Sequence, residues 1–285
     1  MFLPALLIMV STVSNLAEGI IIKKYNQKHS GGGPVFTGIV SLFSMQFFVI
    51  TNEEGYCFTS EVFYWGIISA VLYASASLLT YISLECGSFA MTMLILSYTI
   101  LMQIIYGIIF LNENASVFTY TGIAFLMISI YFMNGKDRER KKISVKWIAA
   151  VSATFLTCGL YGIVQRMQQI YFKDARTNQF MIVTLGLSAI ILICYGMIKY
   201  GKKNIDVIKS GGIYAAFAGI SNGITNFFGL VLYTLMPISI ASPLKSGVKI
   251  IISFAASVLL FKEKFKKRQL VGLFLGTLAI IFLNT

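Results

Sequence analysis

Long apolar segments recur along the whole chain, and they constrain its fold more than any other feature of the sequence. Of the 285 residues, 57% are hydrophobic and 12% are charged, which is too little charge to cover the surface of a water-soluble domain of this length. About 20 consecutive apolar residues span a bilayer as a helix, because a helix satisfies its own backbone polar groups. The sequence therefore predicts an all-α, multi-pass membrane protein.

Hydropathy predicts ten spanning helices, joined mostly by short connections. Their approximate ranges are 2–22, 35–51, 62–84, 88–111, 117–134, 145–166, 179–199, 212–235, 239–261 and 269–283. The one markedly hydrophilic connection is the basic segment at the middle of the chain. We therefore expect two five-helix units, 1–134 and 146–285, with a basic cytoplasmic linker at 135–145.

Basic residues are distributed unevenly between the two expected membrane faces. Of the 23 Lys and Arg residues, 18 lie in or beside the loops that follow the first, fifth, seventh and ninth predicted helices. The positive-inside rule places these loops in the cytoplasm. We therefore expect a plasma-membrane protein with both termini outside. The same loops account for the net charge of +12, so we expect no nucleic-acid partner.

An internal repeat divides the chain into similar halves. A shift of 150 residues aligns residues 111–134 with residues 261–284 without gaps. Because five helices per half is an odd number, the two halves must cross the membrane in opposite senses. Inverted repeats of this kind recur among transporters, with the substrate site near the midplane between the halves.

Each half ends with an acidic residue and, nine residues later, a glycine within an apolar helix. These pairs are Glu113 with Gly122 and Glu263 with Gly272. In this pattern the chain resembles the EamA-type drug/metabolite transporter superfamily over essentially its whole length. The resemblance implies two inverted five-helix repeats around a central cavity that works by alternating access. Members commonly carry an arginine early in the second helix, which this chain lacks. We interpret the four residues as structural or gating elements.

Two lysines lie inside the ninth predicted helix. A lysine near the centre of a spanning helix costs roughly 2.5–3.5 kcal/mol on insertion scales, against about −0.3 to −0.6 for each Leu, Ile, Phe or Val. Lys245 and Lys249 are four residues apart and share one helical face, which we expect to line a watery cavity. Lys249 falls near the midplane, whereas Lys245 either lines the cavity or reaches the outer interface. The 150-residue shift pairs them with Ile95 and Thr99, so the charge breaks the internal symmetry.

Polar side chains at helical spacing mark one face of the first, third, fourth, sixth, eighth and ninth predicted helices. We expect these six helices to surround the cavity and the others to pack outside. The candidate substrate-binding or coupling residues are Asn15, Glu18, Tyr73, Gln103, Tyr161, Gln165, Asn222, Asn226, Lys245 and Lys249. Glu18 would serve as a proton acceptor, as a cation ligand or as the partner of a lysine. The alternative for the neutral residues is a bond to their own helix or a bond between helices.

The favoured function is a secondary transporter of a small polar metabolite, driven by proton coupling or exchange. The two lysines favour a cargo with an anionic group. The alternative is an organic-cation, drug or choline-like cargo, bound by Glu18 and nearby aromatic rings. A lipid flippase or a non-transporting partner subunit is a lesser alternative. The expected partners are thus the substrate, the lipid bilayer and protons.

Motifs for catalysis and for cofactors are not evident in the sequence. It has no Walker A motif, His29 is the single histidine, and no pair of acidic residues falls at membrane depth, so we expect no catalytic residues and no enzyme. The four cysteines show no CxxC spacing, and we expect neither a disulfide, nor a metal site, nor a cofactor. They are Cys57, Cys86, Cys158 and Cys194.

Two small-residue motifs permit close contact between helices. Gly219 and Gly223 form one pair, and Gly272 and Gly276 form the other, each with three residues between the glycines. Such pairs pack within one chain or between two chains. The sequence therefore leaves a monomer and a homodimer open.

Overall fold

The structure of the protein is a computed structural model, which describes residues 2–28, 32–52, 55–110, 116–133, 144–171, 176–201, 203–235, 238–262 and 266–282. Within these residues all regular structure is helical, which confirms the predicted all-α class. The helices are α1 (Phe2–Lys28), α2 (Gly33–Ile50), α3 (Ser60–Cys86), α4 (Phe89–Ser97), α5 (Ile100–Phe110), α6 (Val117–Met133), α7 (Val145–Tyr171), α8 (Thr177–Tyr200), α9 (Lys203–Leu235), α10 (Ile238–Phe261) and α11 (Lys267–Phe282).

Six stretches of the described chain are long and apolar enough to cross a membrane. They are Leu3–Lys28, Gly33–Ile50, Ser60–Cys86, Phe89–Gly107, Val145–Gln168 and Thr177–Tyr200. The helices α6 and α11, with 17 and 16 residues, are shorter than the usual length of a spanning helix. The protein is therefore a multi-pass membrane protein, while the predicted number of ten spans stays a prediction.

One predicted span, 88–111, contains a break that the sequence pattern did not indicate. It consists of α4 and α5, with Tyr98 and Thr99 in a turn between them. The backbone amides of Tyr98 and Thr99 donate to the carbonyls of Ile95 and Leu96, three residues back, at 3.1 and 3.3 Å. Bonds of this i→i−3 kind wind the chain more tightly than an α-helix, and in mid-helix they often mark a hinge.

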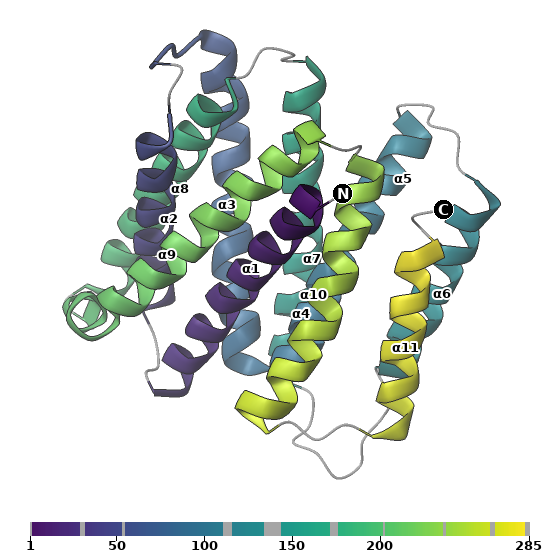
Figure 1. Cartoon of the computed structure of the whole chain (residues 1–285). Helices are drawn as coiled ribbons and strands as arrows, with labels where there is room; N and C mark the ends of the chain where they lie inside the picture. The colour runs from purple at the N-terminus through teal and green to yellow at the C-terminus, as the bar shows by residue number, and fades with distance from the viewer. Residues whose placement is uncertain are drawn as a thin grey trace.

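The two halves of the chain are packed into each other, and the main helix contacts join one half to the other. The helix α1 packs against α9, and α3 packs against α7. The helix α2 contacts α8 and α9, while α3 also contacts α8. In Figure 1, α6 and α11 stand together at one edge of the bundle, and α2 with α8 at the opposite edge.

Glycines allow two helix pairs to pack closely, α9 with α2 and α11 with α6. A Cβ atom on Gly219 of α9 would lie 2.5 Å from the carbonyl oxygen of Val40 on α2, and one on Gly223 would lie 2.7 Å from the Cβ of Phe47. Both distances are shorter than a non-bonded contact, so larger residues would force α9 away from α2. This glycine pair thus packs within one chain.

The second glycine pair also packs within the chain. The hydroxyl of Ser129 on α6 donates to the carbonyl of Gly272 on α11 at 2.6 Å. A Cβ on Gly276 would collide with the Tyr98 hydroxyl and lie 2.9 Å from Ser129 Oγ. Both Gly272 and Gly122 are buried, while Glu113 and Glu263 lie outside the described residues. The described glycines of the repeated motif therefore belong to the scaffold.

The end of the bundle where α1 and α3 finish is closed by apolar packing and by polar contacts. Tyr25 and Phe36 stack with ring centroids 4.4 Å apart, inside a buried cluster that includes Tyr81. The ammonium of Lys23 donates to the carbonyl of Leu84 at 2.7 Å and also to that of Gly87. A cation at a helix C-terminus interacts favourably with the helix dipole, so this contact ties α1 to the end of α3.

Candidate functional site

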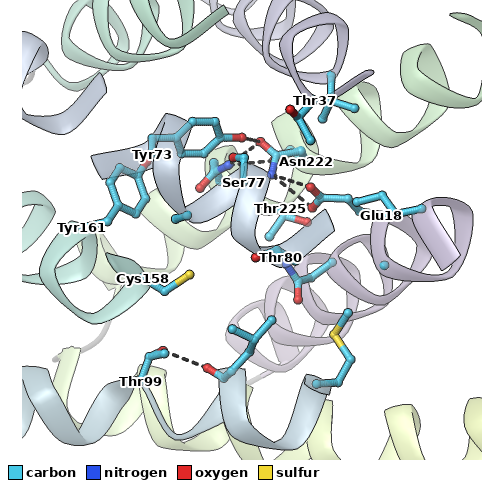
Figure 2. Close-up of a pocket in the computed structure, with 18 of the residues that line it drawn as sticks. Glu18, Thr37, Tyr73, Ser77, Thr80, Thr99, Cys158, Tyr161, Asn222 and Thr225 are labelled. Carbon is cyan, nitrogen blue, oxygen red and sulfur yellow. Dashed lines mark hydrogen bonds between the residues drawn. The ribbon is translucent and has the colours of Figure 1, made fainter. Parts of the chain in front are cut away.

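A polar cavity lies in the middle of the bundle and has two adjoining chambers. The first, here called the Glu18 chamber, has a volume of about 230 Å³ and includes Glu18, Tyr73 and Asn222 in its wall. The second, here called the Lys245 chamber, has a volume of about 250 Å³ and includes Lys245, Gln103 and Gln165. They share a wall formed by Asn15, Leu96, Thr99, Cys158, Tyr161, Thr225, Asn226 and Lys249. Figure 2 shows the Glu18 chamber.

All ten candidate residues predicted from the sequence line one or both chambers. Glu18, Tyr73 and Asn222 line the Glu18 chamber, and Gln103, Gln165 and Lys245 line the Lys245 chamber. The remaining four lie on the shared wall: Asn15, Tyr161, Asn226 and Lys249. Their helices are α1, α3, α5, α7, α9 and α10, which correspond to the six polar faces seen in the sequence.

Asn222 is the centre of a hydrogen-bond network that joins four helices. Its side-chain nitrogen donates to both carboxylate oxygens of Glu18, at 3.1 Å each. Its side-chain oxygen accepts bonds from Ser44 at 2.8 Å, from Tyr73 at 2.9 Å and from Asn226 at 2.9 Å. Figure 2 shows the amide of Asn222 between Tyr73 and Glu18. The network thus links α1, α2, α3 and α9.

Helix packing explains why these side chains meet. Asn222 and Asn226 are four residues apart and lie on one face of α9. That face meets α2 at the close contact of Gly219 and Gly223, which brings Ser44 within bonding distance of Asn222. With three donors on its oxygen, the side chain of Asn222 holds its neighbours in place and has little capacity left for a ligand.

The aromatic part of the wall comes from α3 and α7. The rings of Tyr73 and Tyr161 meet edge to face, with centroids 5.3 Å apart. The amide of Gln165, one turn further along α7, donates to the Tyr161 hydroxyl at 2.9 Å. An edge-to-face pair is a rigid arrangement, so these two rings give one side of the Glu18 chamber a defined shape.

The two lysines of α10 have no polar partner in the part of the chain that the structure describes. Neither ammonium group makes a hydrogen bond or an ion pair there, although Lys249 lies near enough to Glu18 for electrostatic attraction. Lys245 Nζ lies 3.0 Å from the position that a Cβ on Gly229 of α9 would occupy. Lys245 is also among the residues that line the Lys245 chamber, which agrees with the cavity position of the two that the sequence left open.

Some lining residues were not among the ten candidates. Thr37 and Val40 come from α2, a helix that the polar pattern placed outside the cavity, and that expectation was wrong for this stretch. Thr12 lines the Lys245 chamber, and its hydroxyl is buried without a hydrogen-bond partner among the described residues. Single threonines carry a weak signal, because most of them bond their own helix, as Thr37 also does to the carbonyl of Gly33 at 2.9 Å.

The described residues offer no cluster suited to a metal ion. No group of three or more His, Cys, Asp or Glu side chains gathers among them. The thiols of the four cysteines are free.

Six stretches among the described residues are long and apolar enough to cross a membrane, and a cavity lies among the helices, so the class is a multi-pass membrane protein. Residues 145–285 match the model of the EamA-like transporter family. The second half of the chain therefore belongs to the EamA-like transporter family, as the resemblance predicted. This match identifies the protein as a membrane transporter of the drug/metabolite type.

Comparison with solved structures finds a similar fold. A solved structure described as "Crystal structure of protein" is similar to this chain with a TM-score of 0.58, covering 98% of this chain and 96% of its own. The two sequences are 10% identical, so the likeness concerns the fold alone. A sequence comparison with curated proteins finds no match.

Proposed function

We propose that the protein is a secondary transporter that carries a small polar metabolite with an anionic group by alternating access. The observation that carries this proposal is the pair of cavity lysines, neither of which has a polar partner among the described residues. Intramembrane charges are costly and are kept where they bind substrates, ions or protons. Glu18 offsets one positive charge at most, so an anionic ligand would neutralise the charge that the lysines retain.

Glu18 is the proposed coupling residue. Asn222 is its hydrogen-bond donor, and Asn222 in turn holds Tyr73 and Asn226. A proton on Glu18 removes the charge to which the amide of Asn222 is bonded. This change would be transmitted to α3 and α9, which supports a role for Glu18 in proton coupling or in exchange.

The proposed architecture is an inverted repeat of residues 1–134 and 146–285, joined by the linker 135–145. A shift of 150 residues converts α1 into α7, α3 into α9 and α2 into α8. Under this shift the contact of α1 with α9 corresponds to the contact of α7 with α3. The contact of α2 with α9 corresponds to the contact of α8 with α3. In transporters built from such repeats, one half tilts as a rigid body against the other around a substrate site between them.

The proposed orientation has both termini outside the plasma membrane and the basic loops in the cytoplasm. On this orientation, the end closed by Lys23, Tyr25 and Tyr81 faces the cytoplasm. The proposed oligomeric state is a monomer or a homodimer.

A second candidate cargo is an organic cation. The rings of Tyr73 and Tyr161 lie in the wall of the same chamber as the carboxylate of Glu18. Aromatic faces and a carboxylate are the usual ligands of quaternary ammonium groups. This cargo leaves Lys245 and Lys249 without a role, which is why we favour the anion.

The test is flux into proteoliposomes that contain the full chain, with a panel of radiolabelled carboxylates, phosphate esters and choline. We expect uptake of an anionic compound, which Lys249→Gln and Glu18→Gln each reduce strongly. Lys146→Gln is the control, because Lys146 is exposed at the start of α7. Transport that survives Lys249→Gln and is lost in Glu18→Gln would favour the cation instead.

A further inference from the structure

The two chambers differ in charge. The Lys245 chamber has two ammonium groups in its wall, those of Lys245 and Lys249, and no carboxylate among its described lining residues. Glu18 lines the Glu18 chamber and is already bound by Asn222 through both of its oxygens. The positive charge of the cavity is therefore concentrated in the Lys245 chamber.

The geometry keeps both lysines close to each other. Lys245 and Lys249 are four residues apart on one helix, a spacing at which like charges repel. The ammonium of Lys245 lies against Gly229, in space that a larger side chain would fill, so it stays inside the bundle. Two like charges in this position are stabilised when one multiply charged anion lies between them.

Neutral polar groups accompany the lysines in the wall of the chamber. The side chains of Asn15 on α1 and of Gln103 on α5 line it. The amide nitrogen of each can donate hydrogen bonds to the oxygens of a bound anion.

We propose that the Lys245 chamber is the subsite for a doubly charged oxyanion head group, namely phosphate, either as a phosphate ester or as free phosphate. This inference rests on the proposed transport function. Lys245 and Lys249 neutralise the head group, while the side-chain amides of Gln103 and Asn15 donate to its oxygens. The remainder of an ester extends past Thr99 and Asn226 into the Glu18 chamber.

The size and the polarity of the cavity agree with such a ligand. The Lys245 chamber, at about 250 Å³, holds a phosphate group and a few further atoms. The Glu18 chamber, at about 230 Å³, has hydroxyl and amide groups set in a wall that is mostly apolar. A carboxylate in that chamber accepts hydrogen bonds from hydroxyl groups of the organic part, whereas it would repel a second anionic group.

The experiment measures binding to the purified full chain at pH 8, where methyl phosphate is a dianion. Thermal-shift titrations compare methyl phosphate, inorganic phosphate and acetate at equal ionic strength. We expect methyl phosphate to bind at least about tenfold more tightly than acetate, since each charge-assisted bond contributes roughly 1.5–3 kcal/mol. Lys245→Gln and Lys249→Gln should each weaken methyl phosphate binding by about tenfold or more.

Two further variants make the result specific. Lys245→Arg keeps the charge and should bind methyl phosphate within about threefold of the wild type, which also shows that position 245 tolerates substitution. Lys146→Gln removes an exposed lysine and should leave the affinity unchanged. An unliganded melting temperature for every variant shows whether it is folded. Preference for inorganic phosphate over methyl phosphate would identify free phosphate as the source of the head group.

The binding results distinguish an incorrect phosphate subsite from an incorrect anionic cargo. If acetate and methyl phosphate bind equally and both depend on the lysines, the dianion is wrong and the anionic cargo stands. If Lys245→Gln binds methyl phosphate like the wild type, the subsite is wrong. If no anion binds while choline binds and depends on Glu18, both the inference and the anionic cargo are wrong.

Discussion

The side-chain amide of Asn222 on α9 donates to both carboxylate oxygens of Glu18 on α1, at 3.1 Å each. This contact joins the first half of the chain to the second inside the membrane. Because the same amide accepts bonds from Ser44 and Tyr73, a change at Glu18 acts on helices from both halves at once. A change in the charge of Glu18 can therefore alter, through Asn222, the packing of the helices that Asn222 joins.

Replacement of Asn222 by alanine should destabilise the protein and abolish transport. The change leaves the Glu18 carboxylate without its donor and the Tyr73 hydroxyl without its acceptor, at a cost of roughly 1–3 kcal/mol. Thermal unfolding in detergent measures the first effect and liposome flux the second. Asn178→Ala, which removes one bond to the Thr51 carbonyl at 3.3 Å, is the matched control and should have a small effect. An Asn222→Ala protein as stable and active as the wild type would contradict the central role of this residue.

Replacement of Glu18 by glutamine should separate exchange from proton-driven transport. The amide keeps the size of the side chain but carries no titratable group, so a proton gradient can no longer act at this position. We expect counterflow of substrate between two sides to persist while uptake driven by a pH gradient is lost. The control is Glu61→Gln, since Glu61 is exposed in the first turn of α3. Equal loss of both activities would indicate that Glu18 binds the substrate instead.

Alanine at Gly219 should weaken the contact between α9 and α2. Its Cβ would lie 2.5 Å from the Val40 carbonyl oxygen, so the helices must separate, at a cost of about 1–3 kcal/mol. The separation also lengthens the 2.8 Å bond between Ser44 and Asn222. Gly212→Ala on the same helix is the control, because no atom lies within 4 Å of its added Cβ. Thermal unfolding should rank Gly219→Ala well below Gly212→Ala, and the reverse order would contradict the observed packing.

Glutamine at Lys23 should loosen the closed end of the bundle. The substitution removes the cation that binds the carbonyls of Leu84 and Gly87, at the C-terminal end of α3. Cys158 lines both chambers and reports access, once the other three cysteines have been replaced by serine. We expect faster labelling of Cys158 by a thiol reagent added at the Lys23 side.

The neighbouring residue supplies the control for this labelling experiment. Lys24 is exposed, whereas Lys23 is partly buried, and Lys24→Gln should label at the wild-type rate. If both variants label alike, the contacts of Lys23 do not hold this end closed.

Helical spacing predicted ten side chains that line the cavity, but it missed others and could not predict their contacts. Lys245 and Lys249 share a face because they are four residues apart. Because a lysine is costly in lipid, that face was predicted to point into the bundle. The pairing of Glu18 with Asn222, 204 residues away, depends on the packing of α1 against α9 and has no local signal. The contribution of Thr37 was missed although it had a local signal, since Thr37, Ser41 and Ser44 recur at helical spacing and form a small polar face of α2.

The break between α4 and α5 was also beyond sequence reasoning. Neither Tyr98 nor Thr99 is a proline or a glycine, which are the usual signals for a kink. The Tyr98 hydroxyl is bonded to Ser129 of α6 at 2.7 Å, and it lies close to Gly276 of α11. A tertiary contact of this kind can hold a local conformation that the residues alone do not favour.

The break bears on the symmetry of the proposed repeat. In that repeat the 150-residue shift makes Thr99 and Lys249 equivalent positions, and both lie on the wall shared by the two chambers. Thr99 lies in the turn between α4 and α5, whereas Lys249 lies within the single helix α10. Two equivalent positions would therefore bring different groups to one wall, a hydroxyl beside a change in helical winding and an ammonium on a regular helix.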